Sequence, residues 1–369
     1  MTTPQRSIPP CLPPARPIPP KQLFQRLEDL GYKGQDDARR ALCLAAYRHL
    51  RRFELLSHRS CRPEELPPKA NLLLMGPTGC GKTFLVEQLF GKLLMLPTVL
   101  IDITGFSETG YVGDSVRTVL TRMLLAAKDR PELARHGVVC LDEFDKLAGS
   151  HSNIRFDGAG TTKDVTGYGV QKELLKMIEG CTMDVPLGFT ESIYTERTEL
   201  DTREILFVAS GAFSGFKGAA RFTSEGSESI GFNRTPFRKE AIAYRLAEEE
   251  SENIAAFQQY GFLPELIGRF GRIVAMPSLD RDTLRRILTE SLLPRYKHEF
   301  ALEGIKLEID DAVLEKIISD AIKRQIGARG LGSRLTSILE QAAFSGFGGE
   351  SGTISVTMQK GRPTAIHQP

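Results

Sequence analysis

Short apolar runs alternate with segments of helical periodicity between about residues 70 and 276. The runs have the length and composition of buried strands, and they lie at residues 72–75, 99–102, 138–141, 205–209 and 273–276. The segments between them place apolar residues three and four apart, as a helix with one buried face requires. Strands that alternate with helices predict an α/β domain with a parallel sheet and crossover helices.

The same pattern divides the chain into four regions. Residues 1–20 are rich in proline and predict a disordered arm of polyproline character, and residues 21–69 predict a helical lead-in. The α/β domain follows at residues 70–276, with a long insertion at residues 214–253. Residues 277–369 predict a small, mostly helical domain with a late strand at 354–358 and a frayed C-terminal tail.

Composition excludes several classes of protein. The chain has 369 residues, of which 41% are hydrophobic and 25% charged, and its formal net charge is +2, so overall charge argues neither for nor against a nucleic-acid partner. No apolar run approaches the roughly 18 residues of a membrane span, and the first twenty residues lack the apolar core of a secretory signal. The six cysteines form no CxxC pair, which argues against a zinc site and favours reduced thiols in the cytoplasm.

A phosphate-binding motif follows the first strand. Residues 76–83 read GPTGCGKT and match the P-loop spacing between a strand and a helix; the expected nucleotide contacts are Gly76, Pro77, Thr78, Gly79, Cys80, Gly81, Lys82, Thr83 and the adjoining Phe84. The glycines let backbone N–H groups surround phosphate oxygens, and the helix N-terminus adds a favourable dipole. Lys82 is expected at the β- and γ-phosphates of ATP, and the Thr83 hydroxyl is expected to ligate Mg²⁺.

An acidic pair follows the third strand, in the segment VVCLDEFDK at residues 138–146. Asp142 is expected to hold Mg²⁺ with Thr83, and Glu143 to polarise the attacking water as a general base. A strand that ends in solvated acids is common by itself. The P-loop upstream in the sequence favours a catalytic role for this acidic pair. The strand candidate at 99–102 lies between the two motifs in the sequence, which suggests a sheet with one strand inserted between the P-loop strand and the acidic strand.

With these motifs in place, the chain resembles the AAA+ unfoldases ClpX and HslU, and ClpX more closely. The resemblance runs from about residue 30 to residue 346, and the segments that carry it are YKGQDDARRAL, GPTGCGKT, TGYVGDSV, CLDEFDK, DVTGYGVQKELLKMIEG, ILFVASGAF, GFLPELIGR and IGARGL. The resemblance implies an ATPase with a P-loop AAA+ domain and a small helical domain, which unfolds proteins and threads them through a central pore.

The resemblance also implies roles for single residues. Tyr32 and Lys33 match backbone positions that hold adenine, and Ser210 matches the sensor that helps to position the attacking water. Arg269 matches the arginine finger that enters the neighbouring subunit's site, and Arg329 matches a second sensor of the γ-phosphate. Because a finger acts on another chain, the resemblance implies a homohexameric ring.

Three further segments concern the protein partners that the resemblance implies. Tyr111 and Val112, between two glycines, match the pore loop that grips polypeptide, and Tyr168 matches a second pore loop in which the family usually has an acidic residue. In the insertion, Ile230, Gly231 and Phe232 match the tripeptide with which ClpX docks onto the ClpP peptidase. The resemblance therefore implies unfolded or tagged protein substrates and a ClpP-like peptidase partner.

Two departures from the family pattern keep alternatives open. A proline-rich arm stands where the family has an N-terminal zinc module, and the basic pore-entrance loop is not recognisable in residues 181–200. A stand-alone remodeller without a protease would share the same ATPase motifs. A nucleic-acid-dependent AAA+ motor would share them too, although neither a basic channel nor a DNA-binding module is recognisable in the sequence.

Overall fold

The computed structural model describes residues 17–58, 61–106, 116–148, 165–187, 196–216, 254–348 and 351–368. The chain forms two compact units, described separately below. The large unit comprises Met1–Arg26, Asp36–Pro77 and Lys82–Met276, and the small unit comprises Leu27–Gln35, Thr78–Gly81 and Pro277–Pro369. Among the described residues, no helix is long and apolar enough to cross a bilayer.

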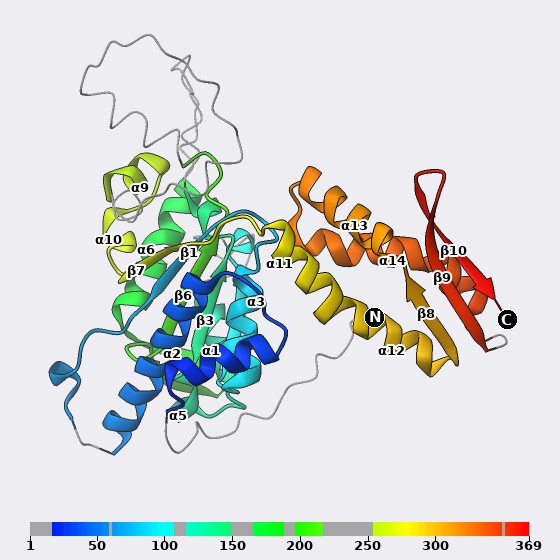
Figure 1. The fold of residues 1–369 in the computed structure, drawn as a ribbon. Coiled ribbons are helices and arrows are strands. Elements are labelled where there is room, and N and C mark those ends of the chain that lie inside the picture. The colour runs from blue at the N-terminus through cyan, green and yellow to red at the C-terminus, as the bar shows by residue number, and fades with distance from the viewer. Residues whose placement is uncertain are drawn as a thin grey trace, which may run out of the picture. The chain divides into compact units, whose positions relative to one another are not determined.

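A five-stranded parallel sheet in the order β2-β3-β6-β1-β7 forms the centre of the large unit (Figure 1). Its strands are β1 (Leu72–Met75), β2 (Thr98–Asp102), β3 (Val138–Asp142), β6 (Leu206–Gly211) and β7 (Arg272–Ala275). All five strands that the apolar runs predict are confirmed within a residue or two. One strand does separate the P-loop strand β1 from the acidic strand β3, but it is β6, and the strand at 98–102 lies at the edge.

Helices cover the sheet because its central strands are apolar on both faces. Every residue of β1 and of β6 is buried, which is typical of parallel strands between layers of helices. The large unit contains the helices α1 (Pro20–Asp29, whose last residues belong to the small unit), α2 (Asp36–Ser57), α3 (Lys82–Val86), α4 (Thr118–Ala126), α5 (Pro131–Ala134), α6 (Val165–Glu179), α9 (Ile254–Tyr260) and α10 (Pro264–Ile267). A π-helical segment at Glu87–Leu93 extends α3.

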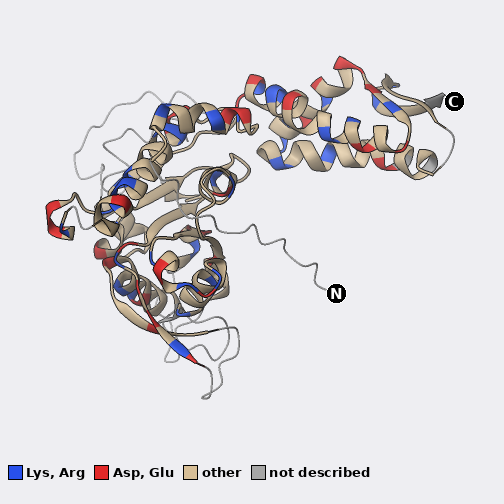
Figure 2. Cartoon of the chain, turned by 90° about the horizontal axis from the view of Figure 1, so that it is seen from below, with Lys and Arg blue, Asp and Glu red and all other residues tan. Residues whose placement is uncertain are grey.

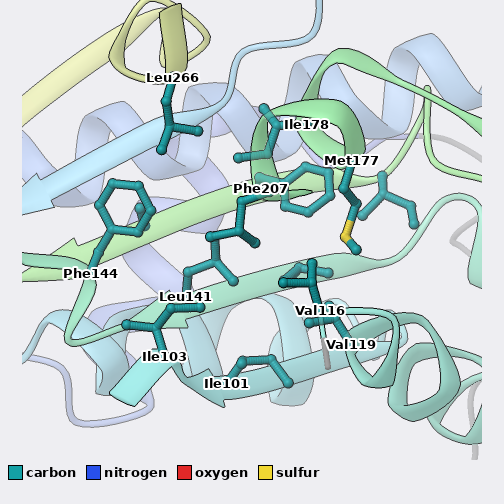
Figure 3. Packing of buried hydrophobic residues seen from close by; sticks show 14 of the residues in the cluster. Ile101, Ile103, Val116, Val119, Leu141, Phe144, Met177, Ile178, Phe207 and Leu266 are labelled. Carbon is teal, nitrogen blue, oxygen red and sulfur yellow. The ribbon is translucent and has the colours of Figure 1, made fainter. Parts of the chain in front are cut away.

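One layer of the core lies between the sheet and helices α4, α6 and α10 (Figure 3). Leu141 and Phe207, from neighbouring strands, belong to the same buried cluster as Val119 of α4 and Met177 of α6. Phe144 follows β3, is 0% exposed, and stacks on Phe262 with ring centroids 5.1 Å apart. The segment after the acidic motif is therefore fixed by apolar packing rather than left as a free loop.

A two-stranded antiparallel sheet lies beside this domain and was not predicted from the sequence. Its strands are β4 (Thr182–Pro186) and β5 (Arg197–Asp201), each with exposed and buried positions mixed. Arg197 pairs with Asp184 across the strands, with 2.5 Å between the side-chain nitrogen and oxygen. The strands occupy the part of the chain in which the basic pore-entrance loop was sought.

The small unit packs four helices against a three-stranded sheet. Its helices are α11 (Arg281–Arg286), α12 (Leu293–Leu302), α13 (Asp311–Lys323) and α14 (Gly327–Gly346), and its strands are β8 (Ile305–Ile309), β9 (Gly352–Gln359) and β10 (Arg362–Gln368), in the order β10-β9-β8. A π-helical segment at Ile287–Leu292 connects α11 to α12. Phe300, Ile317, Leu335 and Ile354 belong to its apolar core.

The late strand predicted at 354–358 is confirmed as part of β9. The prediction of a frayed tail is wrong for the described residues, because β10 pairs antiparallel with β9 from Arg362 to Gln368. The pairing satisfies the backbone hydrogen bonds of a segment whose side chains are too polar to give a strong strand signal.

Candidate nucleotide site

The P-loop connects the end of β1 to the start of α3. Gly79 and Gly81 have φ angles of +80° and +96°, a region that side chains with a Cβ rarely adopt. Gly76 meets a different constraint, because a Cβ there would lie 2.2 Å from the backbone oxygen of Met276. Its N–H donates to the Gly211 carbonyl oxygen at 3.1 Å, which ties the start of the loop to the end of β6.

Lys82 is held inside this loop. Its side chain is 8% exposed, and its Nζ donates to the carbonyl oxygens of Gly76 at 2.6 Å and of Pro77 at 3.0 Å. These two carbonyl oxygens orient the ammonium inside the loop. A buried cation inside a cradle of glycines fits an anionic phosphate ligand.

Asp142 is the centre of a hydrogen-bond cluster that joins three elements. Its Oδ2 accepts from the Thr83 hydroxyl at 2.7 Å, and its Oδ1 accepts from the Ser210 hydroxyl at 2.6 Å. The pairing of Leu141 with Ala209 in the parallel sheet brings the ends of β3 and β6 together, and Thr83 enters from the first turn of α3. Hydroxyl and carboxylate oxygens are hard ligands, so Thr83 and Asp142 fit a Mg²⁺ ion.

Two acidic residues close to this cluster differ in exposure. Glu143 is exposed and has φ 53° and ψ 32°, a left-handed conformation that costs energy for a residue other than glycine. Asp145 is only 5% exposed, and its Oδ1 accepts from the Ala212 N–H at 3.0 Å, which fixes the chain just beyond Ser210. Burial raises the pKa of the Cys140 thiol, with the adjacent Asp142 charge acting in the same direction, so this cysteine stays protonated.

The remaining P-loop residues differ in exposure. Thr78 is exposed, and Cys80 is 2% exposed. Phe84 is 40% exposed, and the Lys92 ammonium lies 6.0 Å from the centroid of its ring.

Within the small unit, Tyr32 lies against the P-loop residues Thr78–Gly81. Tyr32 is 3% exposed, and its hydroxyl donates to the Gly81 carbonyl oxygen at 3.3 Å. The adjacent Lys33 forms an ion pair with Glu290 at 2.9 Å. The side chains of the two residues predicted to hold adenine are therefore fixed, and the Tyr32 N–H itself donates to the Leu27 carbonyl oxygen at 3.0 Å.

The two predicted arginines lie in different surroundings. Arg329 is exposed in the first turn of α14, and the preceding N–H, that of Ala328, donates to the Gly79 carbonyl oxygen at 3.1 Å within the small unit. Arg269 follows α10, and its guanidinium pairs with Glu179 at the end of α6. The ion pair of Arg269 is therefore with Glu179 rather than with the hydrogen-bond cluster of Thr83, Asp142 and Ser210.

The predicted partner-binding residues are only partly described. Tyr168 lies near the start of α6, is 49% exposed, and has the Lys172 ammonium 4.5 Å from its ring centroid. Tyr111 and Val112 lie outside the described residues, as do Ile230, Gly231 and Phe232.

Sequence reasoning missed several buried polar residues that position the site. Asp145 is one, and Asn71 and Gln171, which are 2% and 1% exposed, are two more. Asp145 lies inside the acidic motif, two residues after Glu143, and this position could have identified it as a residue of the site. A single asparagine at the start of a strand and a single glutamine in a helix give no comparable signal.

Comparison with known proteins places this geometry in a family. Residues 67–273 match the family described as AAA domain (Cdc48 subfamily), and residues 279–345 match the C-terminal, D2-small domain, of ClpB protein. Proteins described as ATP-dependent Clp protease ATP-binding subunit ClpX are similar over most of the chain. The one from Porphyromonas gingivalis is 36% identical over 334 residues, which cover 88% of this chain and 77% of that protein.

Two more relatives with the same description agree. The protein from Azotobacter vinelandii is 37% identical over 324 residues, covering 85% of this chain and 71% of the relative. The protein from Bacteroides thetaiotaomicron is 36% identical over 317 residues, which cover 84% of this chain and 73% of that protein. With the P-loop, the acidic strand and the small unit in their expected order, the chain is an ATPase that belongs to the ClpX family of AAA+ proteins.

Proposed function

We propose that this chain is the ATP-hydrolysing unfoldase subunit of a Clp-type protease, working as a homohexamer with a ClpP-like peptidase. The observation that carries the proposal is the Asp142 carboxylate, whose two oxygens accept from Thr83 and Ser210 at 2.7 and 2.6 Å. The P-loop, the acidic strand and a strand-end hydroxyl thereby meet at one point, as ATP hydrolysis requires.

Each residue has one part in the reaction. Gly79, Gly81 and Lys82 bind the phosphates of ATP, and Thr83 and Asp142 would hold Mg²⁺, which neutralises charge that develops on the phosphate oxygens. Glu143 is exposed at the end of β3, where it accepts a proton from the attacking water. Ser210 keeps Asp142 oriented while the γ-phosphate leaves.

Work on protein substrates requires more than one subunit. Arg269 supplies positive charge to the ATP of the neighbouring subunit, and in its own chain its guanidinium pairs with Glu179. Tyr32 and Lys33 hold the adenine, and Arg329 responds to the γ-phosphate. Loss of the γ-phosphate then moves the pore residues Tyr111, Val112 and Tyr168, which grip an unfolded or tagged polypeptide by packing against its side chains.

The first test is ATP turnover by the purified chain with Mg²⁺, measured as phosphate release. Glu143→Gln removes the general base and should lower kcat by roughly 10²- to 10⁴-fold, while fluorescent nucleotide still binds. Glu132→Gln, an exposed acid on α5, is the matched control and should turn over like the parent. Unchanged phosphate release by Glu143→Gln would refute the assignment of the base.

The second test asks what the turnover drives. With a ClpP-like peptidase present, a tagged stable protein should be degraded by the parent, and Tyr111→Ala should slow degradation while ATP turnover persists. Phe232→Ala should abolish co-purification with the peptidase and leave ATP-dependent unfolding intact. Unfolding without any peptidase association, even for the parent chain, would favour a stand-alone remodeller.

Charge argues against a nucleic-acid motor. Basic and acidic residues both occur along the helices that the structure describes (Figure 2), and the formal net charge of the chain is only +2. Proteins that follow a nucleic-acid backbone concentrate basic residues along one groove. ATP turnover stimulated by DNA, and not by unfolded protein, would overturn this part of the proposal.

A further inference from the structure

The backbone around Arg269 is fixed to the sheet by a buried amide. Asn71, 2% exposed, donates from Nδ2 to the Arg269 carbonyl oxygen at 3.1 Å. Its Oδ1 accepts from the Phe207 N–H in β6 at 3.1 Å. One side chain thus connects the arginine to a central strand, and both ends of the amide are satisfied.

A second buried amide fixes the start of the same segment. Gln171 of α6 is 1% exposed, and its Oε1 accepts from the Leu263 N–H at 2.8 Å. Its Nε2 donates to the carbonyl oxygens of Gly261 at 3.1 Å and of Leu147 at 2.8 Å. Between these anchors, Leu266 is 0% exposed and Ile267 is 3% exposed. Since the backbone is held at both ends, the reach of Arg269 depends on rotation of its own side chain.

That side chain is engaged within its own subunit. The Arg269 Nη2 donates to Oε1 of Glu179, the last residue of α6. The side chains of Arg269 and Glu179 are 50% and 39% exposed, so water screens the pair and its opening costs little. An ion pair of this kind adds little to the stability of the fold, but it neutralises the arginine where it lies.

We propose that Glu179 is a positioning residue that holds Arg269 in a withdrawn state, from which the arginine must be released to reach a neighbouring subunit's ATP. The inference rests on the proposed function of Arg269 as the arginine finger. A guanidinium bonds carboxylate and phosphate oxygens through the same N–H groups, so the two acceptors compete for it. The triphosphate of an assembled neighbour carries more charge and displaces Glu179, and phosphate release returns the arginine to the carboxylate.

The competition predicts an effect of modest and definite size. An exposed ion pair shifts an equilibrium by roughly 1.5- to 5-fold. Glu179→Gln removes the competing charge and keeps the side-chain length, so the protein concentration that gives half-maximal ATP turnover should fall by about that factor. Glu179→Asp keeps the charge on a shorter side chain, so its protein concentration for half-maximal turnover should lie between those of Glu179→Gln and the parent. Glu173→Gln removes one acid from the same helix and should behave like the parent.

Further measurements distinguish an effect of Glu179 on Arg269 from a general effect on the structure. Raising the NaCl concentration should shift the parent's protein concentration for half-maximal turnover towards that of Glu179→Gln, because salt screens the ion pair. In an Arg269→Ala background, Glu179→Gln should change nothing, since its effect acts through the arginine. Thermal unfolding of every variant should match the parent, because the pair is exposed.

The outcomes distinguish this inference from the proposed function. If Arg269→Ala abolishes turnover but Glu179→Gln behaves like the parent, or is less active, the withdrawn state is refuted and the finger stands. An effect of Glu179→Gln that persists without Arg269 refutes it equally. If Arg269→Ala turns over ATP like the parent, the finger assignment fails and the role of Glu179 fails with it.

Discussion

Two buried histidines make the stability of the large unit depend on pH. His49 of α2 is 7% exposed and His136 is 9% exposed, and the His49 Nε2–H donates to the His136 carbonyl oxygen at 2.8 Å. Phe53 packs edge-on against the His136 ring, with ring centroids 4.2 Å apart. Burial lowers the pKa of His136 to about 3, and burial likewise lowers the pKa of His49.

The charged groups nearby do not reverse this direction. Arg135 and the other histidine oppose a charge on His136, and only Asp201 favours it. Around His49, Glu204 favours the charged form, whereas Lys69 and Arg52 oppose it. Both rings therefore have a lower pKa in the folded chain than in the unfolded chain, where they take up a proton near pH 6.5.

The sign and size of the effect follow from this difference. Because the folded pKa is below the unfolded one, the stabilisation is complete above about pH 6.5 and is lost as the pH falls towards the folded pKa. Between pH 7.5 and 5.5, His136 should lower the free energy of unfolding by about 1.3 kcal/mol, and His49 should lower it further in the same direction. Equilibrium urea unfolding of the full chain at both pH values measures the loss.

Variants isolate the contribution of each ring. His49→Gln keeps a donor for the His136 carbonyl oxygen and removes one titrating group, so its loss of unfolding free energy on acidification should be smaller than that of the parent. His298→Gln, at an exposed position on α12, should keep the parent's pH dependence. If His49→Gln and the parent lose the same free energy between the two pH values, the assignment to this histidine is refuted.

Two other substitutions test the site and the core. Ser210→Ala removes the hydroxyl that donates to Asp142 at 2.6 Å. Since a hydrogen bond to a charged group contributes about 1.5–3 kcal/mol, kcat for ATP hydrolysis should fall by roughly 10- to 100-fold, while nucleotide binding is retained. Unchanged phosphate release would exclude this role for Ser210. Phe144→Ala empties a site that is 0% exposed and should destabilise the large unit by about 3–5 kcal/mol in urea unfolding, and a loss below 1 kcal/mol would contradict the packing described for it.

The strands that the sequence predicted share a physical property. β1 and β6 are buried at every position, so their sequences are continuous apolar runs that stand out from their surroundings. β4 and β5 each mix exposed and buried positions, and β8 alternates over only five residues. Short strands with a mixed or briefly alternating pattern do not stand out from loops in the sequence, although β4 and β5 pair with each other and β8 pairs with β9 in the folded chain.

The candidate site divides in the same way. The P-loop and the acidic pair are local motifs, so their chemistry can be predicted from spacing alone. The bond from Asn71 joins residues 198 apart in sequence, and the pair formed by Arg269 and Glu179 joins residues 90 apart. Only the folded chain brings such groups together, which is why the polar residues that position Arg269 could not be identified from the sequence.

The hydroxyls on either side of Asp142 have a consequence for the energetics of ligand capture. A carboxylate that accepts from Thr83 and Ser210 has already given up its rotational freedom before any nucleotide arrives. The entropic cost of ordering these three side chains, of order 0.5–1.5 kcal/mol each, therefore belongs to folding rather than to binding. The Mg²⁺ ion proposed for this site would therefore meet oxygens that are already oriented.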